Sequence, residues 1–256
     1  MSVESDGDGP PALLWHSLFI DSTSWELLRP AVARQRRLII VDGPGHGRSG
    51  HPEGEYSIAD CAAAALEVLD AQGVSGPVDW VGNAWGGHIG ITFAAAYPDR
   101  CRTLVTIGTP VHSLTRSERL KQIYPLLAGY RIAGPIGFLR KPLFDALLGA
   151  EAIAAQPGFA ARLVESFRSA DHTGMSQAIR SVSLRRPDLT HLLPDVEAPT
   201  LMAACQDDPG WNYDQATVAV AKMPNGRALK VRGTGHVAPM LLEPDLLVRE
   251  TTALWR

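Results

Sequence analysis

The stretch DWVGNAWGGHIG, residues 79–90, contains the pattern that decides the fold. An apolar run leads into GNAWG, residues 82–86, and a segment of helical spacing follows. Glycines at both ends of this five-residue motif allow a sharp turn and close packing of a helix on a strand. The pattern therefore predicts a strand, a tight turn and a helix that together display residue 84, the position of the nucleophile in enzymes built this way. That residue is Ala84, whose methyl group cannot attack a substrate.

Length and composition describe a globular protein with one large domain, or one domain with an insertion. The chain has 256 residues, of which 45% are hydrophobic and 20% charged, so it can bury a sizeable core. A net charge of −3 provides no general attraction to nucleic acid or to anionic lipid. The short basic cluster Arg34, Arg36 and Arg37 is interpreted as a solvated helix end rather than a binding patch. We therefore expect no nucleic-acid partner.

Cysteine usage and hydropathy indicate a cytoplasmic protein. Cys61, Cys101 and Cys205 are widely spaced and odd in number, which is typical of reduced, buried thiols rather than of a disulfide framework or a zinc site. Residues 1–11 are acidic and glycine-rich, without the basic start or apolar core of a signal peptide. No later apolar run reaches the ~18 to 20 residues that cross a membrane. We expect no membrane association and leave self-association as a homodimer open.

Short apolar runs alternate with longer segments of helical period along most of the chain. The runs have the length and the branched residues of buried strands, and the longer segments repeat apolar residues every three to four positions. This alternation predicts an α/β fold, with a mostly parallel sheet and helices on both faces. The predicted strands are residues 12–16, 37–42, 77–82, 102–108, 200–205 and 228–233, and the clearest helices are 57–73, 85–98 and 243–255.

One long stretch breaks the alternation. Residues 111–194 contain no convincing strand, only helical segments separated by AGYRIAGPIG, QPGF and DHTG. An insertion of this size at one edge of a parallel sheet predicts a helical lid over the site, with an independent structural subdomain as the alternative. The predicted domains are a core of residues 1–110 and 195–256 and a lid of residues 111–194.

Residues that could act with position 84 follow two later predicted strands. CQDDPGW provides Asp207 and Asp208, and GTGHVAPMLLEPD provides His236 on a glycine-rich loop before the last helix. The chain order of nucleophile position, acid and histidine is that of the α/β-hydrolase arrangement. In such a site the acid accepts a hydrogen bond from the histidine ring and stabilises the imidazolium. We predict His236 as the catalytic base.

The turn after the first predicted strand is a candidate oxyanion hole. HSLF places His16, Ser17 and Leu18 where backbone N–H groups face a developing negative charge. Leu18 is the predicted first donor, and Trp85, directly after the central turn residue, is the second. The loop VDGPGHGRSG, residues 41–50, lacks the Lys-Ser/Thr ending of a phosphate-binding loop, so we interpret it as the pocket floor, with His46 structural.

Together these motifs resemble the α/β-hydrolase superfamily over nearly the whole chain apart from the lid. They are HSLFIDSTSW, VDGPGHGRSG, GNAWGG, PTLMAACQDDPG and GTGHVAPMLLEPD. The opening is similar to 3-oxoadipate enol-lactonases and small esterases, whereas the GN-x-WGG turn is similar to carbon–carbon bond hydrolases of aromatic degradation. The family pattern Gly-x-x-Asp, with Cys205 on the glycine, implies that Asp208 is the orienting acid. Members usually have a strand hairpin ahead of LLWH, so we expect this sheet to start short and expose an edge.

The resemblance implies a serine hydrolase of small, mainly apolar esters or lactones, with no metal or organic cofactor. The family usually has serine at position 84, with aspartate in dehalogenases and cysteine in dienelactone hydrolases. We favour the interpretation that Ala84 replaces a serine and leaves an inactive, binding-competent form. The alternatives are a carbon–carbon bond hydrolase of vinylogous diketones and a non-catalytic ligand receptor. The predicted substrate contacts are His16, Ser17, Asn83, Tyr124, Tyr130 and Phe138, with Phe159 as a further candidate for the pocket wall.

Overall fold

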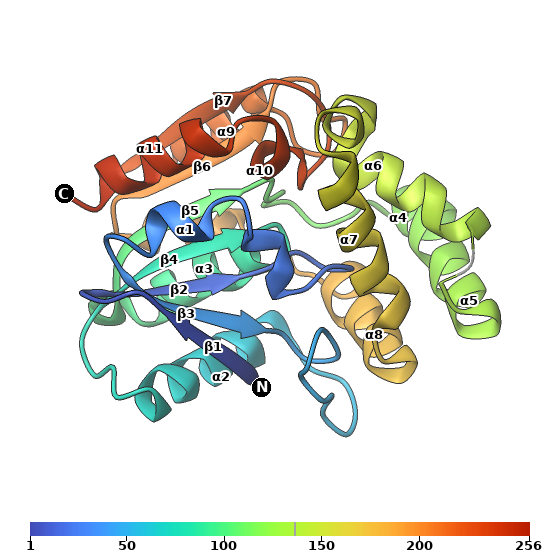
Figure 1. Cartoon of the computed structure of the whole chain (residues 1–256), viewed down its shortest axis with the longest axis horizontal. Coiled ribbons are helices and arrows are strands. Elements are labelled where there is room, and N and C mark those ends of the chain that lie inside the picture. The colour runs from blue at the N-terminus through green and yellow to red at the C-terminus, as the bar shows by residue number, and fades with distance from the viewer. Residues whose placement is uncertain (136) are drawn as a thin grey trace.

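The computed structural model describes residues 1–135 and 137–256 and is built on a seven-stranded sheet (Figure 1). The strand order is β1-β3-β2-β4-β5-β6-β7, and only the pair of β1 and β3 is antiparallel. The prediction of a mostly parallel α/β sheet is confirmed. The strands are β1 (Ser2–Asp6), β2 (Pro11–Trp15), β3 (Arg37–Asp42), β4 (Val78–Asn83), β5 (Cys101–Ile107), β6 (Thr200–Cys205) and β7 (Gly226–Val231).

The first strand corrects one sequence-based expectation. The sheet was expected to expose an edge ahead of β2, but β1 pairs along β3, with Val3 opposite Val41, and covers that edge. The acidic residues that hid this strand from a hydropathy reading are paired in the structure. Arg29 forms ion pairs with Glu4 at 2.8 Å and with Asp6 at 2.6 Å, while Val3 packs against the core.

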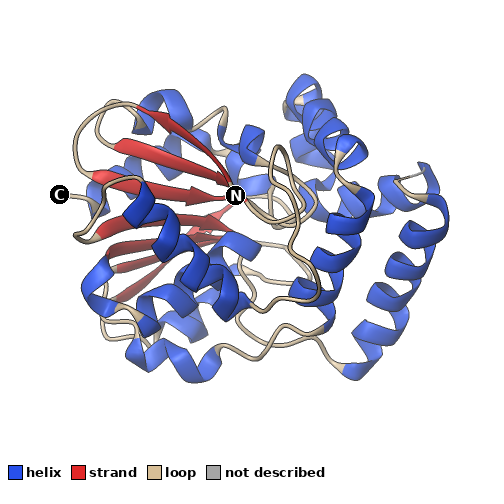
Figure 2. Ribbon diagram, turned by 90° about the horizontal axis from the view of Figure 1, so that it is seen from below, coloured by secondary structure: helices blue, strands red, loops and turns tan. Residues whose placement is uncertain are grey.

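Helices pack on both faces of the sheet, as predicted (Figures 1 and 2). α1 packs with α11, and α2 packs with α3, which also covers β4 and β5. The start of α2 follows from sequence, because Ser57 and Asp60 form a reciprocal capping box. The elements are η1 (Ser22–Trp25), α1 (Arg29–Val32), α2 (Ile58–Ala71), α3 (Trp85–Ala96), η2 (Pro98–Arg100), α9 (Tyr213–Val220), α10 (Ala238–Leu242) and α11 (Pro244–Leu254).

Among the described residues between β5 and β6, all regular secondary structure is helical, joined by loops such as residues 108–115. Figure 1 shows these helices as a separate layer beyond the carboxyl ends of the parallel strands, where the lid was expected. In the same view α5 lies on the side of this layer farthest from the sheet. The elements are α4 (Arg116–Glu118), η3 (Arg119–Ile123), α5 (Tyr124–Ala133), α6 (Gly137–Ala155), α7 (Pro157–Ser169), α8 (His172–Ala178), η4 (Ile179–Leu184) and η5 (Thr190–Asp195).

The amino ends of the strands are joined by a buried charge cluster around Asp79. This fully buried carboxylate on β4 accepts hydrogen bonds from Arg36 at 2.6 Å, from Arg102 and from Thr103 at 2.7 Å. The guanidinium of Arg36 also lies 4.7 Å from the ring centre of Trp255. The interpretation of Arg36 as part of a solvated helix end is therefore wrong, because its charge partner lies 43 residues away in sequence.

The hydrophobic core lies between the sheet and the helices packed on its two faces. It includes aromatic rings next to the turn at residue 84. Trp15 stacks on Trp80 with ring centres 6.3 Å apart, and it meets Trp85 edge-on at 5.7 Å. All six residues of β4 and all six of β6 are buried. This packing gives the central strands a rigid base from which their carboxyl-end loops project. No helix in the described ranges has the length and hydropathy needed to cross a bilayer.

Candidate active site

The turn between β4 and α3 holds Ala84 in a strained conformation. Its φ is +44° and its ψ is −96°, a region that residues with a side chain rarely adopt. Its N–H donates to the carbonyl of Ile107 at 2.8 Å. A Cβ on Gly82 would lie 2.2 Å from Gly86, and one on Gly86 would lie 1.9 Å from the Trp15 carbonyl. The two glycines are therefore required for this approach of helix to strand, which presents residue 84 at the carboxyl end of the sheet.

Asp208 and His236 form a hydrogen-bonded pair at that same end. His236 Nδ1 lies 2.5 Å from Asp208 Oδ2. The other carboxylate oxygen accepts from the backbone N–H groups of Gly210 at 2.8 Å and Trp211 at 3.3 Å. Asp208 is buried, whereas the adjacent Asp207 is exposed. The structure thus places Asp208, of the two neighbouring acids, where it can orient the histidine.

Asn83 connects the histidine loop to the turn. Its Nδ2 donates to the carbonyls of Ile107 and His236, both at 2.9 Å. Its Oδ1 is buried and has no partner among the described residues. Asn83 was predicted to contact substrate, and only this oxygen remains available for such a contact. In the structure the side chain joins the His236 loop to the residue that precedes Ala84.

The backbone after β2 runs beside the same turn. Gly86 N–H donates to the His16 carbonyl at 3.1 Å, which places residues 16–18 against the start of α3. The N–H groups of Leu18 and Trp85, the two predicted oxyanion donors, have no acceptor in the described part of the chain. Unsatisfied N–H groups at a helix start and an adjacent turn suit a developing oxyanion. The backbone of Phe19, just after Leu18, has a φ of +74°.

Two buried histidines hold this turn in place. His16 Nε2 accepts from Gly43 N–H at 2.9 Å, so Nδ1 carries the proton and donates to the Ser17 carbonyl at 2.7 Å. His46 Nε2 accepts from Phe19 N–H at 3.3 Å. Burial lowers the pKa of both histidines, that of His46 to about 3, with the neighbouring His16 ring as a smaller cause for His46. Both rings are therefore neutral supports at neutral pH.

The predicted substrate contacts at His16 and Ser17 have little free surface in this structure. Both residues are buried, and both ring nitrogens of His16 are already bonded to the backbone. Any contribution of His16 to substrate binding must pass through the turn that it supports. Ser17 accepts the His16 hydrogen bond with its own carbonyl and so belongs to the same support.

The predicted aromatic wall is only partly assembled. Tyr130 is fully buried, with its ring 5.4 Å from Phe167 and 5.0 Å from His172. Phe167 in turn meets Phe19 edge-on at 5.7 Å, which links α7 to the turn after β2. The Tyr130 hydroxyl has no partner among the described residues, and burial raises its pKa to about 12. The hydroxyl is therefore neutral at neutral pH and fully buried.

The other predicted wall residues lie elsewhere in the lid. Tyr124 and Phe138 are 52% and 68% exposed, and α5, which begins at Tyr124, lies on the far side of the lid from the sheet in Figure 1. Phe159 is buried beside the guanidinium of Arg162. The helical spacing of these residues indicated only that one face is apolar. It did not indicate which face the tertiary packing turns inward.

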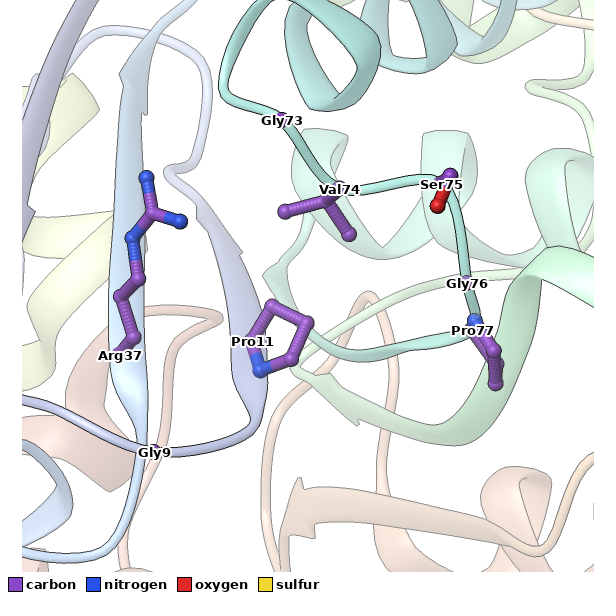
Figure 3. A pocket seen from close by; sticks show the side chains of 8 residues that line it. All are labelled: Gly9, Pro11, Arg37, Gly73, Val74, Ser75, Gly76 and Pro77. Atoms are coloured by element: carbon purple, nitrogen blue, oxygen red, sulfur yellow. The ribbon is translucent and has the colours of Figure 1, made fainter.

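Two cavities lie away from the Asp208–His236 pair. One, of about 260 Å³, is at the amino ends of the strands, opposite the loops of the candidate site (Figure 3). The other, of about 480 Å³, lies between the start of α2 and the end of η4. Ligands of open parallel sheets bind at the carboxyl ends of the strands. The cavity in Figure 3 is therefore not assigned to the catalytic chemistry. Its lining is Gly9, Pro11, Arg37, Gly73, Val74, Ser75, Gly76 and Pro77.

Sequence reasoning missed several supports of the site. The N–H groups of Gly210 and Trp211 that hold Asp208 were not predicted, although DDPGW is a typical turn sequence in which an Asp accepts from the following backbone. The contact of Phe19 with Phe167 was also missed. No local signal predicts that contact, because the two residues are brought together only by the lid.

Comparisons with known proteins agree with this architecture. A model of the alpha/beta hydrolase fold family matches residues 10–241. Over 248 residues the chain is 30% identical to RutD of Azorhizobium caulinodans, whose name assigns it carbamate hydrolysis; the match covers 95% of this chain and 90% of RutD.

Two solved structures share the fold at low identity. An esterase from Thermogutta terrifontis has a TM-score of 0.91 at 24% identity, covering 100% of this chain and 92% of the esterase. An enol-lactonase from Burkholderia xenovorans has a TM-score of 0.89 at 19% identity, covering 99% of this chain and 95% of the lactonase. At these identities the likeness extends to the fold alone.

Proposed function

Because the chain belongs to the alpha/beta hydrolase fold family, we propose that it is a hydrolase of small carboxylic esters or lactones. In this proposal a serine at position 84 supplies the nucleophile, and the Ala84 chain is a form that binds substrate without turnover. One observation carries the proposal. The Asp208–His236 pair is hydrogen-bonded through Asn83 to the strained turn at Ala84, although the alanine side chain has no proton that a general base could remove.

The chemistry of the serine form follows from the positions of the remaining groups. His236, held by Asp208, takes the proton of the serine hydroxyl as its oxygen attacks the ester or lactone carbonyl. The carbonyl oxygen becomes an oxyanion, which accepts hydrogen bonds from the N–H groups of Leu18 and Trp85. His236 then gives its proton to the leaving alcohol. Water, activated by the same histidine, releases the carboxylic acid.

The Ala84 chain lacks only one oxygen of this arrangement. The oxyanion donors, the His236 loop and the lid contacts do not depend on that oxygen. The proposal therefore includes binding of the ester at an affinity close to that of the serine form, with the bound ester left intact. Tight binding without product release distinguishes this form from a misfolded one.

A second candidate is direct attack by water in the Ala84 chain itself. It is favoured by Ala84 together with the match to RutD over 95% of this chain, since RutD is named for carbamate hydrolysis. Here His236 takes a proton from water as the water oxygen attacks the carbamate carbonyl, without a covalent enzyme intermediate. The C–N bond of the tetrahedral adduct then breaks, His236 returns the proton to the leaving amine, and the carbonyl carbon leaves as carbonate or its ester. The two candidates differ in whether residue 84 takes part in bond making.

The test compares the Ala84 chain with the Ala84→Ser variant on 4-nitrophenyl acetate, on lactones and on a carbamate. Loss of the nucleophile in a triad enzyme costs about 10⁶-fold in turnover, so the first candidate predicts a very large gain for the serine variant. The double variant Ala84→Ser, His236→Ala is the control and should lose that gain. Equal carbamate turnover by both chains, abolished by His236→Ala alone, would support water attack. A folded serine variant that hydrolyses nothing would favour a receptor.

A further inference from the structure

Exposed apolar side chains gather on the helical layer between β5 and β6. The described chain has six exposed large hydrophobic residues, and four of them lie within residues 120–138. They are Leu120 on η3, Tyr124 and Ile132 on α5, and Phe138 at the start of α6. Ile132 is 87% exposed and Phe138 is 68% exposed. Single exposed apolar residues are ordinary, whereas a group of them marks an interaction surface.

The inner face of α5 is already covered. Tyr130 is fully buried, and its ring stacks on His172 of α8 with ring centres 5.0 Å apart. In Figure 1 this helix lies on the side of the layer farthest from the sheet. Leu120, Tyr124 and Ile132 are separated by four and by eight residues, the spacing of side chains that share one helix face. This second apolar face has no cover among the described residues.

The same segment is strongly basic. Residues 116–141 contain six Arg and Lys and one Glu, a net charge of +5, whereas the whole chain carries −3. The rest of the chain therefore carries −8. Lys121 and Arg131 are exposed and form no ion pair within the described residues, while Lys141 pairs with Asp145 on its own helix at 2.6 Å. The expectation of no membrane association was based on the charge of the whole chain, which conceals this separation.

We name the outer patch by its four apolar residues, Leu120, Tyr124, Ile132 and Phe138, together with the basic residues Lys121 and Arg131. Its charge argues against a second copy of this chain as the cover. A two-fold dimer places the same surface of both subunits face to face, so two basic patches would meet. Like charges that face each other across an interface are costly. The complementary partner is therefore anionic.

The arrangement of the outer patch favours a lipid surface over an acidic protein. The core of a protein interface is apolar and depleted of charge, and its charged residues lie at the rim. In the outer patch the two types alternate, because Lys121 follows Leu120 and Arg131 precedes Ile132. This composition is typical of helices that lie in the interface of a bilayer. Their large apolar side chains reach the acyl boundary, and their Lys and Arg side chains meet the anionic headgroups.

We propose that the outer patch docks this protein on the surface of an anionic phospholipid bilayer. Ile132 and Phe138 insert between the headgroups, and Lys121 and Arg131 contact the lipid phosphates. The association is peripheral, with α5 at the bilayer surface and the sheet on the far side of the helical layer. The inference goes beyond the proposed function and does not depend on the reaction at residue 84.

The test is co-sedimentation of the chain with vesicles of phosphatidylcholine alone and of phosphatidylcholine mixed with an equal part of phosphatidylglycerol. We expect stronger binding to the mixed vesicles, weakened at about 1 M salt, where the Debye length is about 3 Å. Lys121→Gln with Arg131→Gln should weaken binding about 25-fold, because each basic side chain near an anionic surface strengthens it about 5-fold. Ile132→Ser with Phe138→Ser should weaken it at least about 10-fold, because apolar burial is lost.

The matched control is Val218→Ser with Lys222→Gln. Val218 is 64% exposed on α9, and Lys222 is exposed just beyond that helix, so this variant removes the same residue types outside the outer patch. We expect it to bind like the parent chain. Because every replaced side chain is exposed, the far-UV circular dichroism of all variants should match that of the parent.

Three results would overturn the proposal. The parent chain could remain in the supernatant with both kinds of vesicle, or the control could lose as much binding as the patch variants. The third result is binding of soluble polyglutamate as strongly as of the mixed vesicles, unchanged by Ile132→Ser with Phe138→Ser. That result would assign the outer patch to an acidic protein, because no apolar side chain would be inserted.

Discussion

The side-chain amide of Asn83 donates a hydrogen bond of 2.9 Å to the backbone carbonyl of His236, a residue 153 positions later in the chain. The same Nδ2 also donates to Ile107 at the end of β5. One amide group therefore joins the turn at Ala84, the neighbouring strand and the histidine loop. The alignment of His236 with residue 84 depends on a buried polar contact as well as on the Asp208 carboxylate.

Replacing this amide should affect both stability and turnover. Asn83→Ala removes the donor to the His236 carbonyl, whereas the Ile107 carbonyl keeps its bond from the Ala84 N–H at 2.8 Å. Losing the donor of one such carbonyl costs about 1–3 kcal/mol. In the Ala84→Ser background we expect a lower free energy of unfolding and a turnover at least ~10-fold lower, because His236 is no longer held at its geometry. Denaturant unfolding and ester kinetics measure the two effects separately.

The matched control is Asn225→Ala. Asn225 Nδ2 makes the same type of bond, to the Glu197 carbonyl at 2.9 Å, but it is exposed and directly precedes β7, at the amino end of the strand and away from the carboxyl-end site. We expect it to change the free energy of unfolding by at most about 0.5 kcal/mol, as for ordinary surface substitutions. Equal turnover losses in the two variants would contradict a positioning role for Asn83.

The two adjacent acids should differ strongly in importance. In the Ala84→Ser background, Asp208→Asn should reduce turnover by about 10⁴-fold with binding retained, because the amide disfavours the required histidine tautomer. Asp207→Asn should have a small effect, since Asp207 is exposed and its one hydrogen bond within the described residues is from its backbone N–H to the Gly233 carbonyl at 3.1 Å. Steady-state kinetics on an activated ester decides the ranking, and the reverse order would move the acid to Asp207.

The strain at Ala84 predicts an unusual response to glycine. Glycine adopts positive φ freely, so Ala84→Gly should raise the free energy of unfolding by about 1 kcal/mol. The control Ala64→Gly lies in the middle of α2, where glycine lowers helix stability by about 1 kcal/mol. Chemical denaturation of both variants gives the two signs. A loss of stability in Ala84→Gly would mean that the turn is not strained in solution.

The buried histidines predict a fall in stability with acid. His46 has a pKa of about 3 in the folded chain, against 6.5 ordinarily, so only the unfolded chain takes up a proton between these values. Its contribution is therefore fully present above about pH 6.5 and is lost as the pH falls toward 3. Relative to His46→Gln, the parent chain should lose about 2 kcal/mol between pH 7 and pH 5.

Denaturant unfolding at pH 7, 6 and 5 measures this difference. The exposed His191 provides the control, because His191→Gln removes a histidine without removing a buried one. We expect the His191 variant to follow the parent chain at each pH. A constant difference between the parent chain and His46→Gln across the range would show that His46 does not resist protonation.

Local patterns were enough to predict most of the fold. Apolar strand runs and 3.6-residue helix periods are encoded by neighbouring residues, and the six predicted strands all occur, with ends shifted by at most two residues. The turn at Ala84 could also be predicted from sequence, because glycine spacing and strand–helix order are local properties. β1 was missed because its residues are polar, and its place in the sheet comes from pairing with β3 and from Arg29 rather than from a pattern of its own.

The candidate site, like the fold, could be predicted from sequence only in part. The chain order of position 84, acid and histidine could be predicted from sequence, because strand ends of a parallel sheet meet at one edge. The direction in which each side chain of the lid points could not be predicted from sequence. Tyr124 and Phe138 were expected in the pocket wall and are exposed. Arg185 and Arg186 are adjacent and of the same residue type, yet Arg185 pairs with Glu55 at the surface and Arg186 is buried. Burial of a guanidinium depends on helices far away in sequence, so only the tertiary structure decides it.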